Sequence, residues 1–293
     1  MKTDEARQAG APLSEPFPDS MAQERGKTPE QAPNPGQSLN TVLAMRYGRG
    51  RLGGSGVILT AIQRARFHGR RIKPMEGDLK SRTLASYYPS HAPDGRPILD
   101  GATMPRSENL GDFKSWIGDT MDDMAEDRIS RALDISGGDR VMQELLADLS
   151  LSAFCGERGF KFLALCMLGS DMEDFNHIRA AVDAGVLHPM HMILIMNEGA
   201  IRSGQNPDGA FDAIVGHPDY QALTDSGAVP VYLPRLPCMD ALREQRLNFY
   251  DVAANRPGSD GKRPRATMQH MTNKWLGDFE AQHVLRDTAG RLP

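Results

Sequence analysis

Cysteines, aromatic residues and long apolar runs are all scarce in this chain, and each shortage argues against a class of protein. The 293 residues include three cysteines, an odd number without a Cys-x-x-Cys pair, which argues against a disulfide framework and a zinc site. Aromatic residues make up 6%, which is few for a protein that stacks nucleic-acid bases. No apolar run approaches the roughly 20 residues of a membrane-spanning helix, and no secretory signal is visible, so we expect a cytoplasmic protein.

Positive charge is not in excess either, since the formal net charge is -4. This argues against a surface built wholly for nucleic acid, but it leaves room for a local basic patch. Residues 1–38 are rich in proline and polar residues and contain almost no large apolar ones, so we predict a disordered tail there. The chain as a whole is 40% hydrophobic and 25% charged, as globular proteins are, and residues 39–293 predict a single domain.

Short apolar segments alternate with helical segments from residue 39 onward. Strands are predicted at 41–47, 71–75, 131–135, 160–168, 190–196 and 230–233. Helices are predicted at 57–68, 110–127, 141–149, 172–184, 211–215, 220–225, 239–253 and 267–283. Nearly continuous apolar strands that alternate with helices are typical of a parallel sheet covered on both faces, so we predict a doubly wound α/β fold. In such folds the ligand lies at the carboxyl ends of the strands.

A glycine-rich loop, Gly48–Gly56, follows the first predicted strand and opens the first predicted helix. Its glycines allow backbone N–H groups to converge on an anion, and the positive end of the helix points at the same place. A tight structural turn would use the same glycines, so the loop alone leaves both interpretations open.

The segment Leu52–Ile58, with the sequence LGGSGVI, resembles the deviant Walker A motif of the ParA/MinD partition and positioning ATPases, KGGxGK followed by Thr or Ser. Four later segments resemble that family in the expected order, at residues 71–78, 132–138, 192–197 and 231–235. The resemblance covers roughly residues 39–285. It implies a P-loop NTPase fold, ATP or ADP as ligand, and a homodimer.

The resemblance also implies roles for residues at the ends of the other strands. Glu76 and Asp78 stand where the family has Asp-x-Asp, and Asp134 stands at the Walker B position, so these three acids are the candidate catalytic residues. Asn197 and Pro234 stand where the family borders adenine, although Asn197 as an ordinary loop residue is an open alternative. The candidate nucleotide-binding residues are Arg49, Arg51, Gly53, Gly54, Ser55, Gly56, Val57, Ile58, Asn197 and Pro234.

Three departures from the motif argue against catalysis. Leu52 and Val57 replace the two lysines of the motif, and Ile58 replaces the hydroxyl that holds Mg²⁺. Phosphoryl transfer depends on positioning and on stabilising negative charge, so we expect little or no ATP hydrolysis, weakened nucleotide binding and a poor site for Mg²⁺. Arg49 or Arg51 is the alternative source of positive charge, since arginine clamps phosphate well. A buried Asp134 would need a partner without Mg²⁺, and an arginine of the glycine-rich loop is the candidate.

The first helix and the segment after it carry the densest basic cluster in the chain, Arg64, Arg66, Arg70 and Arg71. One interpretation is contact with a phosphate backbone, such as plasmid DNA, or with an acidic partner. The other interpretation is a helix face that is only solvated.

The leading hypothesis is a ParA/MinD-like protein of plasmid partition, conjugative transfer or positioning. It would act through self-association and through a partner such as a DNA-binding adaptor, with a degenerate nucleotide site. One alternative is an active Mg²⁺-dependent ATPase that uses Arg49 or Arg51. A second alternative is a nucleotide-free binding module for DNA or an acidic protein.

Overall fold

The computed structural model describes residues 41–135, 144, 151–202, 204–258, 261–286, 288 and 290–293. Within the chain, Leu39–Pro293 forms one compact unit. The predicted tail over residues 1–38 lies outside the described residues, and so does the predicted helix over 141–149 apart from Glu144.

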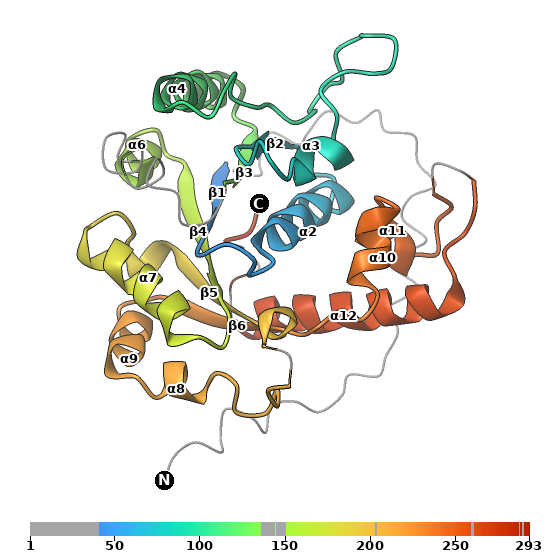
Figure 1. The fold of residues 1–293 in the computed structure, drawn as a ribbon. Helices are drawn as coiled ribbons and strands as arrows, with labels where there is room; N and C mark the ends of the chain where they lie inside the picture. The colour runs from blue at the N-terminus through green and yellow to red at the C-terminus, as the bar shows by residue number, and fades with distance from the viewer. Residues whose placement is uncertain are drawn as a thin grey trace. The chain divides into compact units, whose positions relative to one another are not determined.

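Six strands form the central sheet in the order β2-β3-β1-β4-β5-β6, and every described pair of neighbours is parallel (Figure 1). The strands are β1 (Val42–Tyr47), β2 (Ile72–Glu76), β3 (Ser130–Asp134), β4 (Lys161–Leu168), β5 (Met192–Asn197) and β6 (Val229–Leu233). The predicted doubly wound α/β fold is confirmed. Strands β2 and β3 lie on one side of β1 and β4–β6 lie on the other, so the topological switch point is beside β1.

The apolar strands are buried on both faces, which explains their nearly continuous hydrophobic sequences. Every residue of β1 and of β5 is buried. Register places Met45 beside Leu133 of β3 on one side and beside Ala164 of β4 on the other. Because the strands end at similar levels, the residues that follow β1, β2, β3 and β5 gather at one edge of the sheet.

Helices cover both faces of this sheet. Helix α2 lies over β1–β4 on one face and α12 lies beside β6, while α4, α6 and α7 cover the opposite face (Figure 1). The described helices are α2 (Gly54–Phe67), α3 (Thr83–Tyr87), α4 (Leu110–Asp127), α6 (Leu151–Glu157), α7 (Met172–Asp183), α8 (Asp212–Val215), α9 (Pro218–Asp225), α10 (Met239–Glu244), α11 (Phe249–Ala253) and α12 (Ala266–Leu285). Within the described part of the chain, none of them is both long and apolar enough to cross a membrane.

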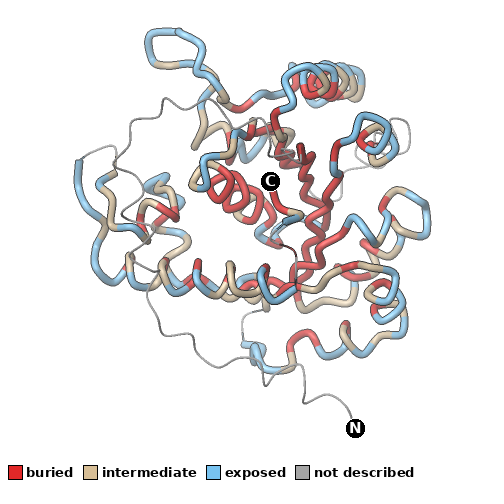
Figure 2. The backbone as a smooth tube through the Cα atoms, turned by 180° about the vertical axis from the view of Figure 1, so that it is seen from behind, coloured by how far each residue is buried: buried red, intermediate tan, exposed pale blue. Residues whose placement is uncertain are grey.

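Helix α2 differs from its prediction, because it does not expose a basic outer face. Residues on all of its sides are buried, including Thr60, Gln63 and Arg64, and Figure 2 shows the helix buried along most of its length. The outer side is covered by α3, α11 and α12, which come from distant parts of the sequence. The periodicity of the helix alone does not reveal this tertiary cover.

The single helix predicted over 239–253 is also wrong, because the structure divides it into α10 and α11. Arg246 adopts a left-handed conformation with φ 51° just after α10. Asn248 then caps α11, with its side-chain oxygen accepting hydrogen bonds from the backbone N–H groups of Tyr250 and Asp251 at 2.9 and 3.2 Å. The break turns α10 toward the carboxyl edge of the sheet.

Candidate functional site

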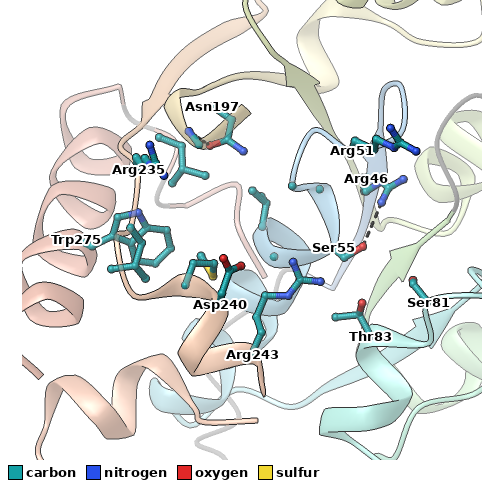
Figure 3. Close-up of a pocket in the computed structure, with 18 of the residues that line it drawn as sticks. Arg46, Arg51, Ser55, Ser81, Thr83, Asn197, Arg235, Asp240, Arg243 and Trp275 are labelled. Atoms are coloured by element: carbon teal, nitrogen blue, oxygen red, sulfur yellow. Dashed lines mark hydrogen bonds between the residues drawn. The ribbon is translucent and has the colours of Figure 1, made fainter. Parts of the chain in front are cut away.

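A pocket of about 570 Å³ opens around the start of α2, at the carboxyl ends of the strands (Figure 3). Its walls come from the glycine-rich loop, the segment before α3, the end of β5, the segment between β6 and α10, α10 itself and α12. Of the predicted site residues, Arg51, Gly53, Gly54, Ser55, Gly56, Val57, Asp78, Asn197 and Pro234 line it. The other four predicted catalytic or nucleotide-binding residues do not line the pocket. Ile58, Glu76 and Asp134 are fully buried, and the side chain of Arg49 is paired with Asp174.

The glycine-rich loop is shaped by close contacts that exclude larger residues. Gly53 precedes α2 in a left-handed conformation with φ 76°. A Cβ atom at Gly53 would lie 2.6 Å from Nδ2 of Asn197. Gly53 therefore serves the structure of the loop, and the same loop presents the start of α2 to the pocket.

Asn197 connects the end of β5 to the loop. Its Nδ2 donates a hydrogen bond to the carbonyl of Leu52 at 2.8 Å, and its Oδ1 accepts one from the backbone N–H of Gly199 at 2.9 Å. Both ends of the amide therefore have partners within the protein. Recognition of adenine by Asn197 stays a prediction.

Arg46, near the end of β1, is the most informative residue that the sequence prediction missed. Its Nη1 lies 3.2 Å from Oδ1 of Asp134 and donates a hydrogen bond to Oγ of Ser55, also at 3.2 Å. The side chain crosses the start of α2, where a Cβ at Gly54 would lie 2.2 Å from Cδ of Arg46. The available signal was an arginine in an otherwise apolar strand, because such a charge needs a buried partner.

The cationic partner of Asp134 is Arg46 of β1, and the prediction that it is an arginine of the glycine-rich loop is wrong. The carboxyl group of Asp134 is completely buried, and its Oδ2 has no hydrogen-bond partner among the described residues. Burial raises the pKa of Asp134, and the positive charge of Arg46 opposes that effect. Asp134 is thus engaged by an internal cation.

Glu76 and Asp78 hold the segment that enters α3. Glu76 accepts hydrogen bonds from the backbone N–H groups of Leu84 at 2.7 Å and of Asp78 at 3.1 Å. Oδ1 of Asp78 accepts from the N–H groups of Lys80 and Ser81, each at 3.1 Å. Glu76 and Asp78 therefore satisfy backbone groups of this segment.

The two acids have opposite pKa shifts. Burial raises the pKa of Glu76 to about 7, the charge of Asp134 adds to the rise, and the hydrogen bonds to Glu76 oppose it. Burial also acts to raise the pKa of Asp78, but hydrogen bonds from Ser81 and Lys80 outweigh it and leave that pKa below its ordinary value. Glu76 is therefore partly protonated near neutral pH, whereas Asp78 is ionised.

The stability of the protein should depend on pH through Glu76. The pKa of Glu76 in the folded protein, about 7, is higher than its ordinary value of 4.5, so the folded state binds the proton more tightly. The stabilising effect is complete below the ordinary pKa and is lost as the pH rises toward 7. We expect Glu76→Gln to remove about 2 kcal/mol of this decline in unfolding free energy between about pH 5 and pH 8. Urea denaturation of both proteins across that range measures it, and parallel pH profiles would contradict it.

The residues at the base of the pocket do not fit Mg²⁺. Val57 and Ile58 are buried and apolar, the Ser55 hydroxyl accepts from Arg46, and Asp134 is paired with the same arginine. Among the described residues, no group of three or more His, Cys, Asp or Glu side chains is arranged to hold a metal ion. A divalent cation at Asp134 would compete with Arg46 for the carboxylate.

The two arginines proposed as substitutes for the P-loop lysine have different surroundings. Nη1 of Arg49 lies 3.2 Å from Oδ1 of Asp174, at the start of α7, and Arg49 does not line the pocket. Arg51 lines the pocket, is exposed, and has no ion-pair partner in the described part of the chain. Only Arg51 is thus placed for the predicted role.

All four arginines in the predicted basic cluster have partners within the fold, and Arg64 and Arg66 are the two that are engaged most deeply. Nε of Arg64 donates to both oxygens of Glu280 on α12, at 2.9 and 3.0 Å, and only 7% of Arg64 is exposed. Arg66 donates to the carbonyl groups of Ile72 and Asp100 and lies 4.1 Å from the ring centre of Tyr88. Arg64 is therefore unavailable to a partner, and both arginines stabilise the fold.

Arg70 and Arg71 are closer to the surface. Arg70 donates to the carbonyl of Leu292, and the exposed Arg71 forms an ion pair with Asp100 at 2.9 Å. A partner-binding role for these two residues stays a prediction. The four arginines do not form one continuous unpaired face.

No family model matches the sequence, and no curated protein matches it. Among solved structures, the fold is similar to the MinC:MinD cell division protein complex of Aquifex aeolicus, with 11% identity, 81% of this chain and 96% of that chain covered, and a TM-score of 0.47. It is also similar to MinD from the same organism, with 9% identity, 82% of this chain and 97% of that chain covered, and a TM-score of 0.43. Chloroplast FtsY from Physcomitrella patens has 14% identity, with 73% of this chain and 64% of that chain covered and a TM-score of 0.43. At these scores the comparisons say nothing about function, and the α/β fold is established by the strand order itself.

Proposed function

We propose that this chain is a P-loop-type protein that binds the phosphates of ATP or ADP without Mg²⁺ and hydrolyses little or none. The ion pair between Arg46 and Asp134 is the observation that carries this proposal. It places a guanidinium beside the start of α2 and engages the acid that would otherwise hold a metal ion. Arginine binds phosphate oxygens through two parallel hydrogen bonds, so it can take over part of the charge neutralisation.

The charge of the pocket supports an anionic ligand. Four arginines and two aspartates line it, in a chain whose formal net charge is -4. The first N–H groups of a helix have no partners within the helix, and the start of α2 is part of the pocket wall. The apolar side chain of Val57 at the same place adds no charge for a transition state, which is consistent with binding without catalysis.

The cellular role that we propose is a ParA/MinD-like role in plasmid partition, conjugative transfer or positioning. Its support is the order of the motif-like segments together with the parallel fold. The protein would act as a homodimer that contacts a DNA-binding adaptor or another partner. Nucleotide would bias that association by binding rather than by turnover.

A second candidate is a nucleotide-free binding module. Asn197 favours it, because one N–H and the oxygen of its amide are already engaged with Leu52 and Gly199 within the protein. Such a module would keep the fold and the loop as structure only.

Nucleotide binding in the presence of either Mg²⁺ or EDTA tests the proposal. We expect fluorescent ATP and ADP to bind with dissociation constants that differ by less than about threefold between the two conditions, because Arg46 engages Asp134, the acid that a metal ion would need. Phosphate release should not exceed the background of the buffer. Turnover that requires Mg²⁺ would support an active ATPase that uses Arg51, and no binding in either condition would support the nucleotide-free module.

A further inference from the structure

Arg243 is a charged residue of the pocket that lies outside every predicted motif and has no role in the proposed function. Arg243 belongs to α10, lines the pocket and is exposed. Its side chain has no hydrogen-bond or ion-pair partner within the described ranges of the chain. A long cationic side chain with no partner, pointing at an anion-binding loop, is available for a ligand.

We propose that Arg243 binds the phosphate chain of a metal-free nucleoside polyphosphate from the side opposite the glycine-rich loop. The proposal rests on the proposed function and adds a residue to the same site. Arg243 would supply positive charge that Leu52 and Val57 do not provide in the loop.

The position of Arg243 follows from the packing of α10 against α3. Its neighbour Leu242 is fully buried, and the hydroxyl of Tyr87 on α3 donates a hydrogen bond to the carbonyl of Leu242 at 3.3 Å. In Figure 3 the side chain of Arg243 extends from α10 toward the part of the pocket that contains Ser55 and Thr83. The backbone of α10 is therefore fixed while the guanidinium stays free.

An electrostatic observation agrees with this geometry. The positive charge of Arg243 acts to lower the pKa of Asp134, which lies at the base of the pocket beside Arg46. The guanidinium is thus close enough to influence a group on the far side of the loop. A phosphate chain between them would meet Arg243 on one side and the start of α2 on the other.

The balance of charge favours a polyphosphate. Asp134 compensates Arg46, and Arg235 lies beside Asn197 and Trp275 (Figure 3). Asp78 and Asp240 also line the pocket, but in the described structure neither forms an ion pair with Arg51 or Arg243, which are the unpaired cations beside the loop. Two guanidinium groups can each bind a different phosphate through paired hydrogen bonds. A ligand with two or three linked phosphates uses both, whereas a single phosphate uses one.

Two matched substitutions test the proposal, Arg243→Gln and Arg246→Gln. Both remove one positive charge from an exposed arginine of the same segment, but Arg246 does not line the pocket. Binding of fluorescent ATP, and of inorganic tripolyphosphate as its competitor, is measured in EDTA. We expect Arg243→Gln to weaken both ligands about tenfold or more and Arg246→Gln to change them by less than about twofold.

The outcomes separate this proposal from the proposed function. Equal affinity in wild type and Arg243→Gln would overturn the role of Arg243 and leave the proposed function intact. An equal loss in both variants would also overturn it, because the effect would then come from overall charge. If wild type binds neither ATP nor tripolyphosphate, the proposed function fails and the role of Arg243 fails with it. Equal melting temperatures of the two variants exclude misfolding as the cause.

Discussion

Replacing Arg46 with methionine should lower the free energy of unfolding by about 3 to 5 kcal/mol at neutral pH. The substitution leaves the carboxylate of Asp134 completely buried with neither oxygen paired to a cation. Methionine preserves part of the apolar contact across Gly54, so the loss reports mainly on the charge. Urea denaturation followed by circular dichroism measures the difference.

Two comparisons show whether the ion pair is the cause. The loss in Arg46→Met should shrink as the pH falls, because Asp134 then takes up a proton and its buried charge disappears. Adding Asp134→Leu to Arg46→Met should recover part of the stability, since no unpaired charge remains. A loss of less than about 1 kcal/mol that does not change with pH would show that the pair contributes little.

Restoring the lysine and hydroxyl of the loop should produce Mg²⁺-dependent nucleotide binding only when Arg46 is also removed. Val57→Lys with Ile58→Thr restores a phosphate cation and a metal-binding hydroxyl. With Arg46 still in place, Ser55 and Asp134 stay engaged by its guanidinium. In Arg46→Ala/Val57→Lys/Ile58→Thr, we expect Mg²⁺ to tighten ATP binding by about tenfold or more, because a metal can then reach Asp134.

Isothermal titration with ATP, with and without Mg²⁺, compares the double and the triple variant. The double variant is the matched control, since it differs only at Arg46. Equal dependence on Mg²⁺ in both would contradict the view that Arg46 blocks the metal site. Absence of any nucleotide binding in the triple variant would indicate that the base side of the pocket, around Asn197, does not accept a nucleotide.

The fold was predictable because local pattern and tertiary structure agree in most segments. Apolar runs predicted all six strands, and both ends of α4 were predicted correctly. At the start of α4 the side chain of Asn109 caps the helix and accepts a hydrogen bond from the N–H of Asp112 at 2.8 Å. The cover over α2 was not predictable, because it depends on contacts with α12, more than 200 residues away at Glu280. Nor does the segment between α10 and α11 contain the glycine or proline that usually marks a break.

The position of the pocket was predictable from the sequence, but the contacts between its side chains were not. Glycine spacing located the pocket at the start of α2, and the need of Asp134 for a cationic partner was foreseen. The partner is Arg46 on β1 rather than an arginine of the loop, because side-chain direction at the end of a strand depends on packing that no short motif encodes. Arg243 gave no signal at all, since a lone arginine on a short helix is ordinary in sequence.

The hydrogen bonds of Asn197 have a consequence for discrimination between bases. One N–H of the amide donates to the carbonyl of Leu52 and its oxygen accepts from the N–H of Gly199, which leaves one N–H and one lone pair outside these two bonds. Because the two bonds fix the plane of the amide, the remaining donor and acceptor would meet an incoming base in a fixed orientation. A base contact at Asn197 would therefore be compatible with the turn that precedes α2, and its fixed geometry would favour the base whose edge matches it.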